Sequence, residues 1–196
     1  MHNQSATSLA YAAPHLTDGN LLPVRSAVRG DVGQIADLVL GYVAEGLMLP
    51  RSSSGIAINI DNYVVATDGD RVVACAALEE YSPSLAEVAS VAVARSHHGA
   101  GLGSQVVLGV ERLARARNID ELFALSLTSQ FFLSLEYTST DISNYPEKLA
   151  RYDSLIAAGV QIVPKPCFQK MLGTSWQRPR LVCSTAPSLP IARRAS

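Results

Sequence analysis

The chain has 196 residues, of which 48% are hydrophobic, so it is long enough to bury the core of one domain. Its 16 lysines and arginines nearly balance its 17 aspartates and glutamates, which excludes a global field that would recruit nucleic acid or an anionic membrane. The cysteines, Cys75, Cys167 and Cys183, lack the spacing of a metal site or a disulfide framework, and we expect idle thiols and no metal.

The two ends of the chain lack the periodicity of packed elements. Residues 1–20 mix Ser, Ala, Asn and Pro, and residues 177–196 are similar, so we expect a disordered N-terminal segment and a flexible C-terminal tail around one domain at 21–176. The N-terminus has the features of neither a signal peptide nor a transit peptide, and no apolar run is long enough to span a membrane. These features favour a cytoplasmic protein.

The first elements are a strand and a helix. A strand is predicted at 21–28, and residues 29–46 have apolar side chains at helical spacing, namely Val32, Ile35, Leu38 and Tyr42. Asp31 followed by Gln34 predicts a capping box at the start of this helix.

Three strands and a second helix follow. Residues 62–78 contain two β-rich runs joined by Asp68-Gly69-Asp70, a strong hairpin signal, and residues 85–95 form a third run. Next comes a helix whose apolar face holds Leu102, Val106, Val110 and Leu113. A strand at 121–127, another helix and a terminal strand near 166–172 complete an α+β, or mixed α/β, fold.

Three glycines, Gly99, Gly101 and Gly103, separate the third strand of this group from its helix. Free N–H groups and the positive end of the helix dipole would meet there, which is typical of a pyrophosphate site. A dinucleotide-binding fingerprint needs a third glycine where Ser104 stands, and a P-loop is excluded because no lysine follows the glycines. A flexible turn without a ligand remains an alternative.

The segment "ARSHHGAGLGSQVV" resembles the acetyl-CoA-binding segment of the GNAT family of N-acetyltransferases, with Gly101 and Gly103 in place and His98 where Arg or Gln is usual. The segments "GLMLPRSS", "VVACAAL", "AEVASVAV" and "DISNYPEKLARYD" occur in the order seen in the N-acetylglutamate synthase branch. The resemblance implies a GNAT domain at 21–176, with a central twisted, mostly antiparallel sheet and helices on both faces. We expect a short, stand-alone relative of that branch.

The resemblance also implies where the cosubstrate acetyl-CoA binds. Its pantetheine arm and thioester would contact strand backbone, and its pyrophosphate would contact the glycine turn and the start of the helix. The residues concerned are Val91, Ala92, Val93, His98, Gly99, Ala100, Gly101, Leu102, Gly103 and Ser104.

Two residue types supply the acid–base chemistry of acetyl transfer. Glu87 is an ionisable residue in an otherwise apolar strand, either an outward-facing surface residue or a general base for the amine, and the resemblance favours the base. Ser126 and Ser129 are candidates to protonate the leaving thiolate, or to cap the following helix.

The acceptor is expected to be a small amine. Arg51, with Ser52 beside it, is the candidate clamp for a substrate carboxylate, and Lys170 stands near the place of the family's Arg-x-Ser run. We expect acetylation of the α-amine of an amino acid such as L-glutamate, the first step of arginine biosynthesis. Alternative acceptors are another small amine or a peptide N-terminus, and the alternative to an enzyme is a non-catalytic acyl-CoA-binding domain. The protein assembly that we consider is a homodimer.

Overall fold

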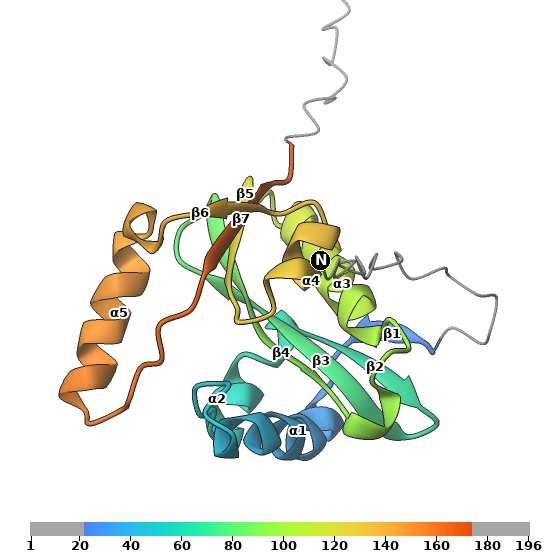
Figure 1. Ribbon diagram of the computed structural model, residues 1–196. Helices are drawn as coiled ribbons and strands as arrows, with labels where there is room; N and C mark the ends of the chain where they lie inside the picture. Colours follow the sequence, from blue (N-terminus) through green and yellow to red (C-terminus); the bar gives the residue numbers. More distant parts are fainter. Residues whose placement is uncertain (1–21, 174–196) are drawn as a thin grey trace, which may run out of the picture.

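Seven strands form one sheet in the computed structural model, which describes residues 22–173 (Figure 1). In sheet order they are β1 (Val24–Ser26), β2 (Tyr63–Asp68), β3 (Arg71–Glu80), β4 (Leu85–Val93), β5 (Glu121–Leu125), β7 (Cys167–Met171) and β6 (Thr138–Thr140). Neighbouring strands are antiparallel except β4 and β5, which are parallel. The predicted mixed α/β fold with a mostly antiparallel sheet is confirmed.

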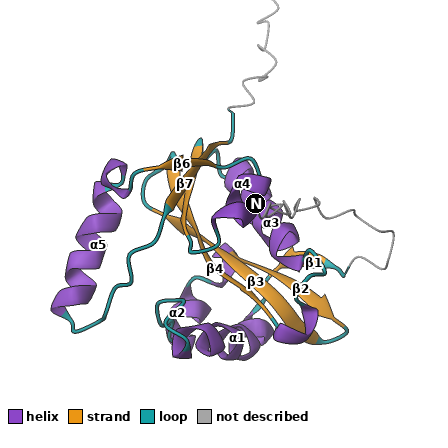
Figure 2. Ribbon diagram, in the orientation of Figure 1, coloured by secondary structure: helices purple, strands orange, loops and turns teal. Residues whose placement is uncertain are grey.

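Helices cover both faces of the sheet (Figure 2). One face carries α1 (Val32–Ala44) and α2 (Ser53–Ile58), with α5 (Pro146–Ala157) joined to that face by ion pairs to β3 and β4, and the other carries α3 (Leu102–Ala116) and α4 (Ser129–Ser134). Four short 3-10 turns connect these elements: η1 (Arg29–Asp31), η2 (Ile60–Asn62), η3 (Arg95–His97) and η4 (Ile142–Asn144).

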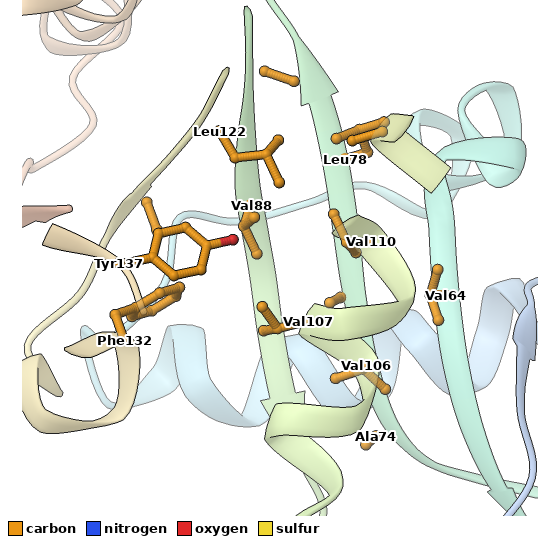
Figure 3. Close-up of a cluster of buried hydrophobic side chains, with 14 of the residues drawn as sticks. Val64, Ala74, Leu78, Val88, Val106, Val107, Val110, Leu122, Phe132 and Tyr137 are labelled. Carbon is orange, nitrogen blue, oxygen red and sulfur yellow. The ribbon is translucent and has the colours of Figure 1, made fainter. Parts of the chain in front are cut away.

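Side-chain alternation along the strands divides the core into two layers. In β2, Val64 and Ala66 pack in the cluster under α3, whereas Tyr63 and Val65 pack in the cluster under α1. Figure 3 shows the α3 layer, where apolar side chains of that helix meet the sheet and two aromatic rings close one end. The labelled members include Val106, Val107, Val110, Phe132 and Tyr137.

The predicted hairpin is confirmed. Asp68 of β2 pairs with Arg71 of β3, so Gly69 and Asp70 form a two-residue turn. Gly69 has φ of 56°, in the left-handed region that such tight hairpin turns require.

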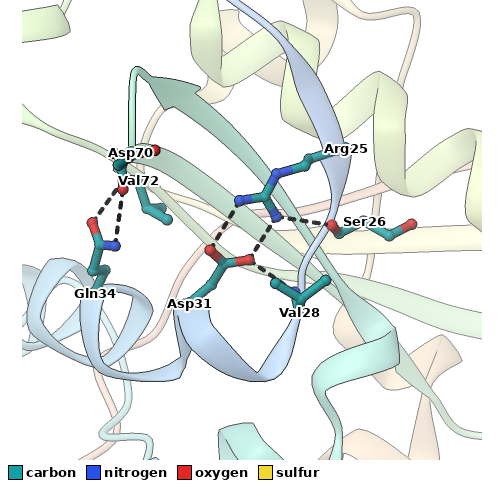
Figure 4. Close-up of polar contacts among 7 residues, drawn as sticks. All are labelled: Arg25, Ser26, Val28, Asp31, Gln34, Asp70 and Val72. Carbon is teal, nitrogen blue, oxygen red and sulfur yellow. Dashed lines mark hydrogen bonds and ion pairs between the residues drawn. The ribbon is translucent and has the colours of Figure 1, made fainter.

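The capping box predicted at the start of α1 is wrong (Figure 4). The Asp31 carboxylate instead accepts hydrogen bonds from Arg25 Nη1 at 2.6 Å and from the backbone N–H of Val28 at 2.8 Å. Gln34 reaches the hairpin, where its Oε1 accepts from the N–H of Val72 and its Nε2 donates to the carbonyl of Asp70. Gln34 therefore ties α1 to the sheet, whereas Asp31 ties the turn η1 to β1 and also caps the start of η1.

The disordered segments predicted at residues 1–20 and 177–196 lie outside the described residues, as do the predicted domain ends at residues 21 and 176. No helix between residues 22 and 173 is long and apolar enough to cross a membrane.

Candidate active site

A cleft opens where the parallel strands β4 and β5 part. Their pairing covers only Leu85–Glu87 against Glu121–Phe123. Beyond it, a register shift against β3 bends β4, and Ser90 takes φ of 52°. The resulting cleft has a volume of about 190 Å³, with Glu87, Ser90 and Val91 among the β4 residues along one wall and residues 125–128 along the other.

The end of β4 leaves part of its backbone unpaired on the cleft side. The N–H of Ala94 donates to the carbonyl of Val73 at 2.7 Å, so the backbone groups of Val93 point away from β3. The Val93 carbonyl accepts the Tyr42 hydroxyl at 2.7 Å. Ala92 is paired with β3, so it does not present backbone groups to the cleft, contrary to its expected role in binding the cosubstrate.

The glycine turn begins α3 at the open end of β4. Gly99 and Gly101 have φ of 81° and 75°, and a Cβ at either position would meet nothing within 4 Å. These two glycines are therefore required by the left-handed backbone, not by crowding inside the protein. A Cβ on Gly103 would lie 3.3 Å from the Phe131 ring, so this glycine allows α3 to pack closely against α4.

The start of α3 presents free backbone donors. Gly101 is its N-cap, and the first N–H groups of the helix, from Leu102 to Ser104, have no carbonyl one turn earlier. Ala100 is exposed beside them, and His98 Nε2 lies 3.0 Å from the Val93 carbonyl, which joins this turn to the end of β4. An anion at this place would face N–H groups and the positive end of the helix dipole.

Glu87 is buried, with 5% of its surface exposed, and it lines the cleft. Lys148 Nζ of α5 donates to its Oε2 at 2.7 Å, and the Tyr81 hydroxyl donates to the same oxygen at 2.9 Å. Burial and the nearby Glu87 charge raise the pKa of the Tyr81 phenol and raise that of Tyr152 to about 12, so both phenols stay protonated. The surface alternative for Glu87 is thus wrong.

Lys148 is a cleft residue that the sequence analysis missed. It is the one buried residue of α5, and its ammonium lies 4.8 Å from the centre of the Tyr152 ring. The sequence offered no local signal for this contact, because its partner Glu87 lies 61 residues away along the chain.

Arg51 lines the same cleft as Glu87. Its Nη2 donates to Glu79 Oε2 at 2.6 Å, and Arg151 of α5 forms an ion pair with the other carboxylate oxygen. Ser52, expected beside Arg51 in the substrate site, is the N-cap of α2, where its hydroxyl accepts the N–H of Gly55 at 3.1 Å.

Ser126 also lines the cleft, whereas Ser129 begins α4. The Ser126 hydroxyl accepts the N–H of Thr128 at 3.0 Å, which holds it in the turn that leads into α4. The N-cap of α4 is Thr128, without a side-chain capping bond, so neither serine caps this helix, and proton donation by Ser126 at the cleft stays a prediction.

Lys170 is not brought to this cleft. It lies opposite Leu122 in the sheet and shares that residue's face, under α3. Its ammonium donates to Glu111 at 2.9 Å and to the carbonyl of Leu135 at 2.8 Å. The expected substrate contact is corrected accordingly, because Glu87 faces the opposite side, towards α5.

The two described thiols are inert. Burial raises the pKa of Cys75 to about 12 and that of Cys167 to about 11, so both remain protonated. The third cysteine, Cys183, lies outside the described residues.

Comparison with known proteins defines the class. The acetyltransferase (GNAT) family model matches residues 50–132, which include Arg51, β4, the glycine turn and α3. An uncharacterized N-acetyltransferase of Chlorobaculum tepidum is 33% identical over 128 residues, covering 65% of this chain and 83% of that protein. The chain therefore belongs to the GNAT family, and it is an N-acetyltransferase.

Amino-acid acetyltransferases are further relatives. The one from Ralstonia nicotianae is 31% identical over 126 residues, covering 63% of this chain but only 28% of that enzyme. An N-acetylglutamate synthase from Neisseria gonorrhoeae, solved with coenzyme A and N-acetyl-glutamate, has the same fold, with a TM-score of 0.69 at 23% identity over 80% of this chain and 36% of that one. A Mycobacterium tuberculosis protein whose structure was solved with CoA has a TM-score of 0.66 at 24% identity, and the match covers 76% of this chain and 98% of that one.

Proposed function

We propose that this enzyme transfers the acetyl group of acetyl-CoA to the α-amine of an amino acid, with L-glutamate as the leading candidate. The observation that carries the proposal is that a buried carboxylate, Glu87, and a guanidinium, Arg51, line one cleft beside unpaired β4 backbone. The amino-acid acetyltransferase relatives support it. With glutamate as acceptor, the reaction would be the first step of arginine biosynthesis.

The cleft offers a group for each part of the reaction. Glu87, fixed by Lys148 and Tyr81, takes a proton from the ammonium of the acceptor, directly or through a water. The neutral nitrogen attacks the thioester carbon, the C–N bond forms and the C–S bond breaks. Ser126 gives the thiolate a proton and is itself reprotonated by the second proton that the acceptor nitrogen loses as the amide forms.

The remaining groups bind and orient. The outward-facing N–H of Val93, with that of Val91 as a second candidate, binds the pantetheine arm and polarises the thioester carbonyl. The start of α3, from Gly101 to Ser104, binds the pyrophosphate. Arg51 binds the carboxylate of the acceptor with its planar fork.

A panel of acceptors assayed for thiol release from acetyl-CoA tests the proposal. The panel contains L-glutamate, L-glutamine, an alkyl amine without a carboxylate and a short peptide, each against a reaction without acceptor. We expect turnover with the amino acids and the highest kcat/KM with glutamate. Turnover confined to the alkyl amine or the peptide would refute the amino-acid proposal and leave only the family assignment.

A further inference from the structure

Two glutamates face each other across β3 and β4 next to the cleft. Glu79 and Glu87 are direct register partners, so their side chains lie on the same face of the sheet. Like charges in such a pair repel, and each carboxylate has its own cations from outside the sheet. Lys148 binds Glu87, whereas Arg51 and Arg151 both bind Glu79.

The Glu79 cluster carries surplus positive charge. The Glu79 carboxylate lies between two guanidinium groups. The next carboxylate along the strand, that of Glu80, forms an ion pair with Arg117 and does not balance the extra charge. Burial, and then the charge of Arg51, lower the pKa of Arg151, which shows that the two arginines are close enough to repel. Burial raises the pKa of the Tyr63 phenol on the sheet side, so this group stays neutral.

Arg51 stands between two clefts. It lines the cleft that contains Glu87 and also a second cleft of about 560 Å³, whose walls include Glu79 and Arg151. Because the two arginines hold the two oxygens of one carboxylate, their guanidinium groups are spaced to hold any single carboxylate. An acceptor in the first cleft can therefore reach the pair from the side of Arg51.

We propose that Arg151 determines acceptor specificity: with Arg51 it binds the α-carboxylate of the acceptor, and Glu79 occupies the two arginines until the substrate displaces it. Cβ atoms of directly facing residues lie about 4.5–5.5 Å apart. If the α-carboxylate of the acceptor takes the place of the Glu79 carboxylate, the α-amine of the same acceptor lies next to Glu87, which deprotonates it. The α-carboxylate and the α-amine are neighbours because one α-carbon carries both. This inference depends on the proposed function.

The test compares an amino acid with its α-amide. In Arg151→Gln, the KM for the amino acid should rise about ten- to hundredfold, because a charge-assisted contact is lost, while the KM for the α-amide stays unchanged. Arg151→Lys should recover part of the affinity, since an ammonium keeps the charge but loses the fork. Glu79→Gln should lower the KM for the amino acid, because the internal competitor is gone.

Arg115→Gln is the matched control. Arg115 is also on a helix and also pairs with a glutamate, Glu111, but it lies on the opposite face of the sheet. It should leave both KM values unchanged. If Arg151→Gln does not fold, Arg151→Lys provides the same comparison of acid and amide.

Two failures are distinguishable. If the wild-type enzyme acetylates only amines without a carboxylate, the proposed function fails and this inference fails with it. If it acetylates amino acids and the Arg151 variants change the KM for acid and amide equally, or change neither, the proposed function stands and the carboxylate site at Arg151 is refuted.

Discussion

Glu87 keeps a charge inside the protein because Lys148 is buried with it. The side chains are 7% and 3% exposed, and their polar atoms lie 2.7 Å apart. A pair so deeply buried stabilises the fold weakly, but removing one partner leaves an uncompensated charge, which typically costs about 3–5 kcal/mol. A change at Glu87 therefore alters stability as well as chemistry, and a test of catalysis must separate them.

The first prediction concerns Glu87→Gln. Turnover should fall about a hundredfold or more, because a general base of this kind contributes that much, while acetyl-CoA affinity by calorimetry stays near normal. The double variant Glu87→Gln with Lys148→Met removes the unpaired ammonium and should be equally slow.

Glu111→Gln is the control for that prediction. Glu111 is as buried as Glu87 and pairs with Lys170 at 2.9 Å, but it lies under α3. It should lower the free energy of unfolding and leave turnover per folded molecule unchanged. Equal rates in Glu87→Gln and Glu111→Gln would show that Glu87 has only a structural role.

The second prediction concerns Asp31. Hydrogen bonding from Arg25 holds the pKa of this carboxyl below its usual range, with help from the Val28 N–H and against the effect of burial. A lowered folded-state pKa means that the charged form stabilises the fold above the unfolded pKa of about 3.9, and that this stabilisation is lost as pH falls through the folded pKa.

Asp31→Asn should therefore lower the free energy of unfolding by about 1–2 kcal/mol at pH 7, a modest value because Arg25 is partly exposed to solvent. The difference from wild type should shrink below about pH 4. Urea unfolding at several pH values measures it, and a difference that is constant across that range would contradict the ion-pair explanation.

At the scale of elements, sequence patterns predicted those with strong local signals. The hairpin at Gly69, the strand containing Glu87 and the helix after Gly101 were confirmed. Two short elements were missed because tertiary contacts create them, and only one helix was predicted between β5 and β7, where α4 and α5 both lie. The six-residue α2 depends on burial of Ile56, and the three-residue β6 depends on pairing with β7, about 30 residues away.

The site was predictable where its residues share a strand or turn, and less so elsewhere. Glu87 and the glycine turn lie in one continuous segment. Lys148 and Arg151 come from α5, and nothing local in the sequence shows that α5 lies over the face that carries Glu79. Lys170 was placed wrongly because one position along a strand decides which face a side chain occupies.

The third prediction concerns the approach of α3 to the sheet. A Cβ on Gly109 would lie 2.6 Å from Val64 Cγ1, so Gly109→Ala should force the helix and β2 apart and cost about 1–3 kcal/mol, more than the gain in helix propensity. In α1, Gly41 has nothing within 4 Å, so Gly41→Ala should stabilise by up to about 1 kcal/mol. Thermal unfolding measures both, and the same sign in both variants would refute the packing argument.

Across the whole molecule, the sheet consists of two parts joined at one short contact. The strands from β1 to β4 form one antiparallel part and β5, β7 and β6 form the other, and β4 meets β5 over three residue pairs. The proposed cosubstrate would lie in the opening between the parts, along β4 and the turn before α4, with its pyrophosphate at the start of α3. Binding there would stabilise the junction of the two parts.

The last prediction follows from that placement. Acetyl-CoA at about a hundred times its Kd should stabilise the fold by about 2.7 kcal/mol, which corresponds to a rise in Tm of about 5–10 °C for a domain of this size. Gly101→Val should abolish the rise, because a β-branched residue cannot hold φ of 75° and its methyl groups would occupy the space of the pyrophosphate. Gly159→Val is the matched control, since Gly159 has φ of 83° and open surroundings at the far end of α5. The Gly159→Val variant should have a lower Tm than the wild type without ligand, yet show the same increase in Tm when acetyl-CoA is added. An increase in Tm that persists in Gly101→Val would show that the pyrophosphate binds elsewhere.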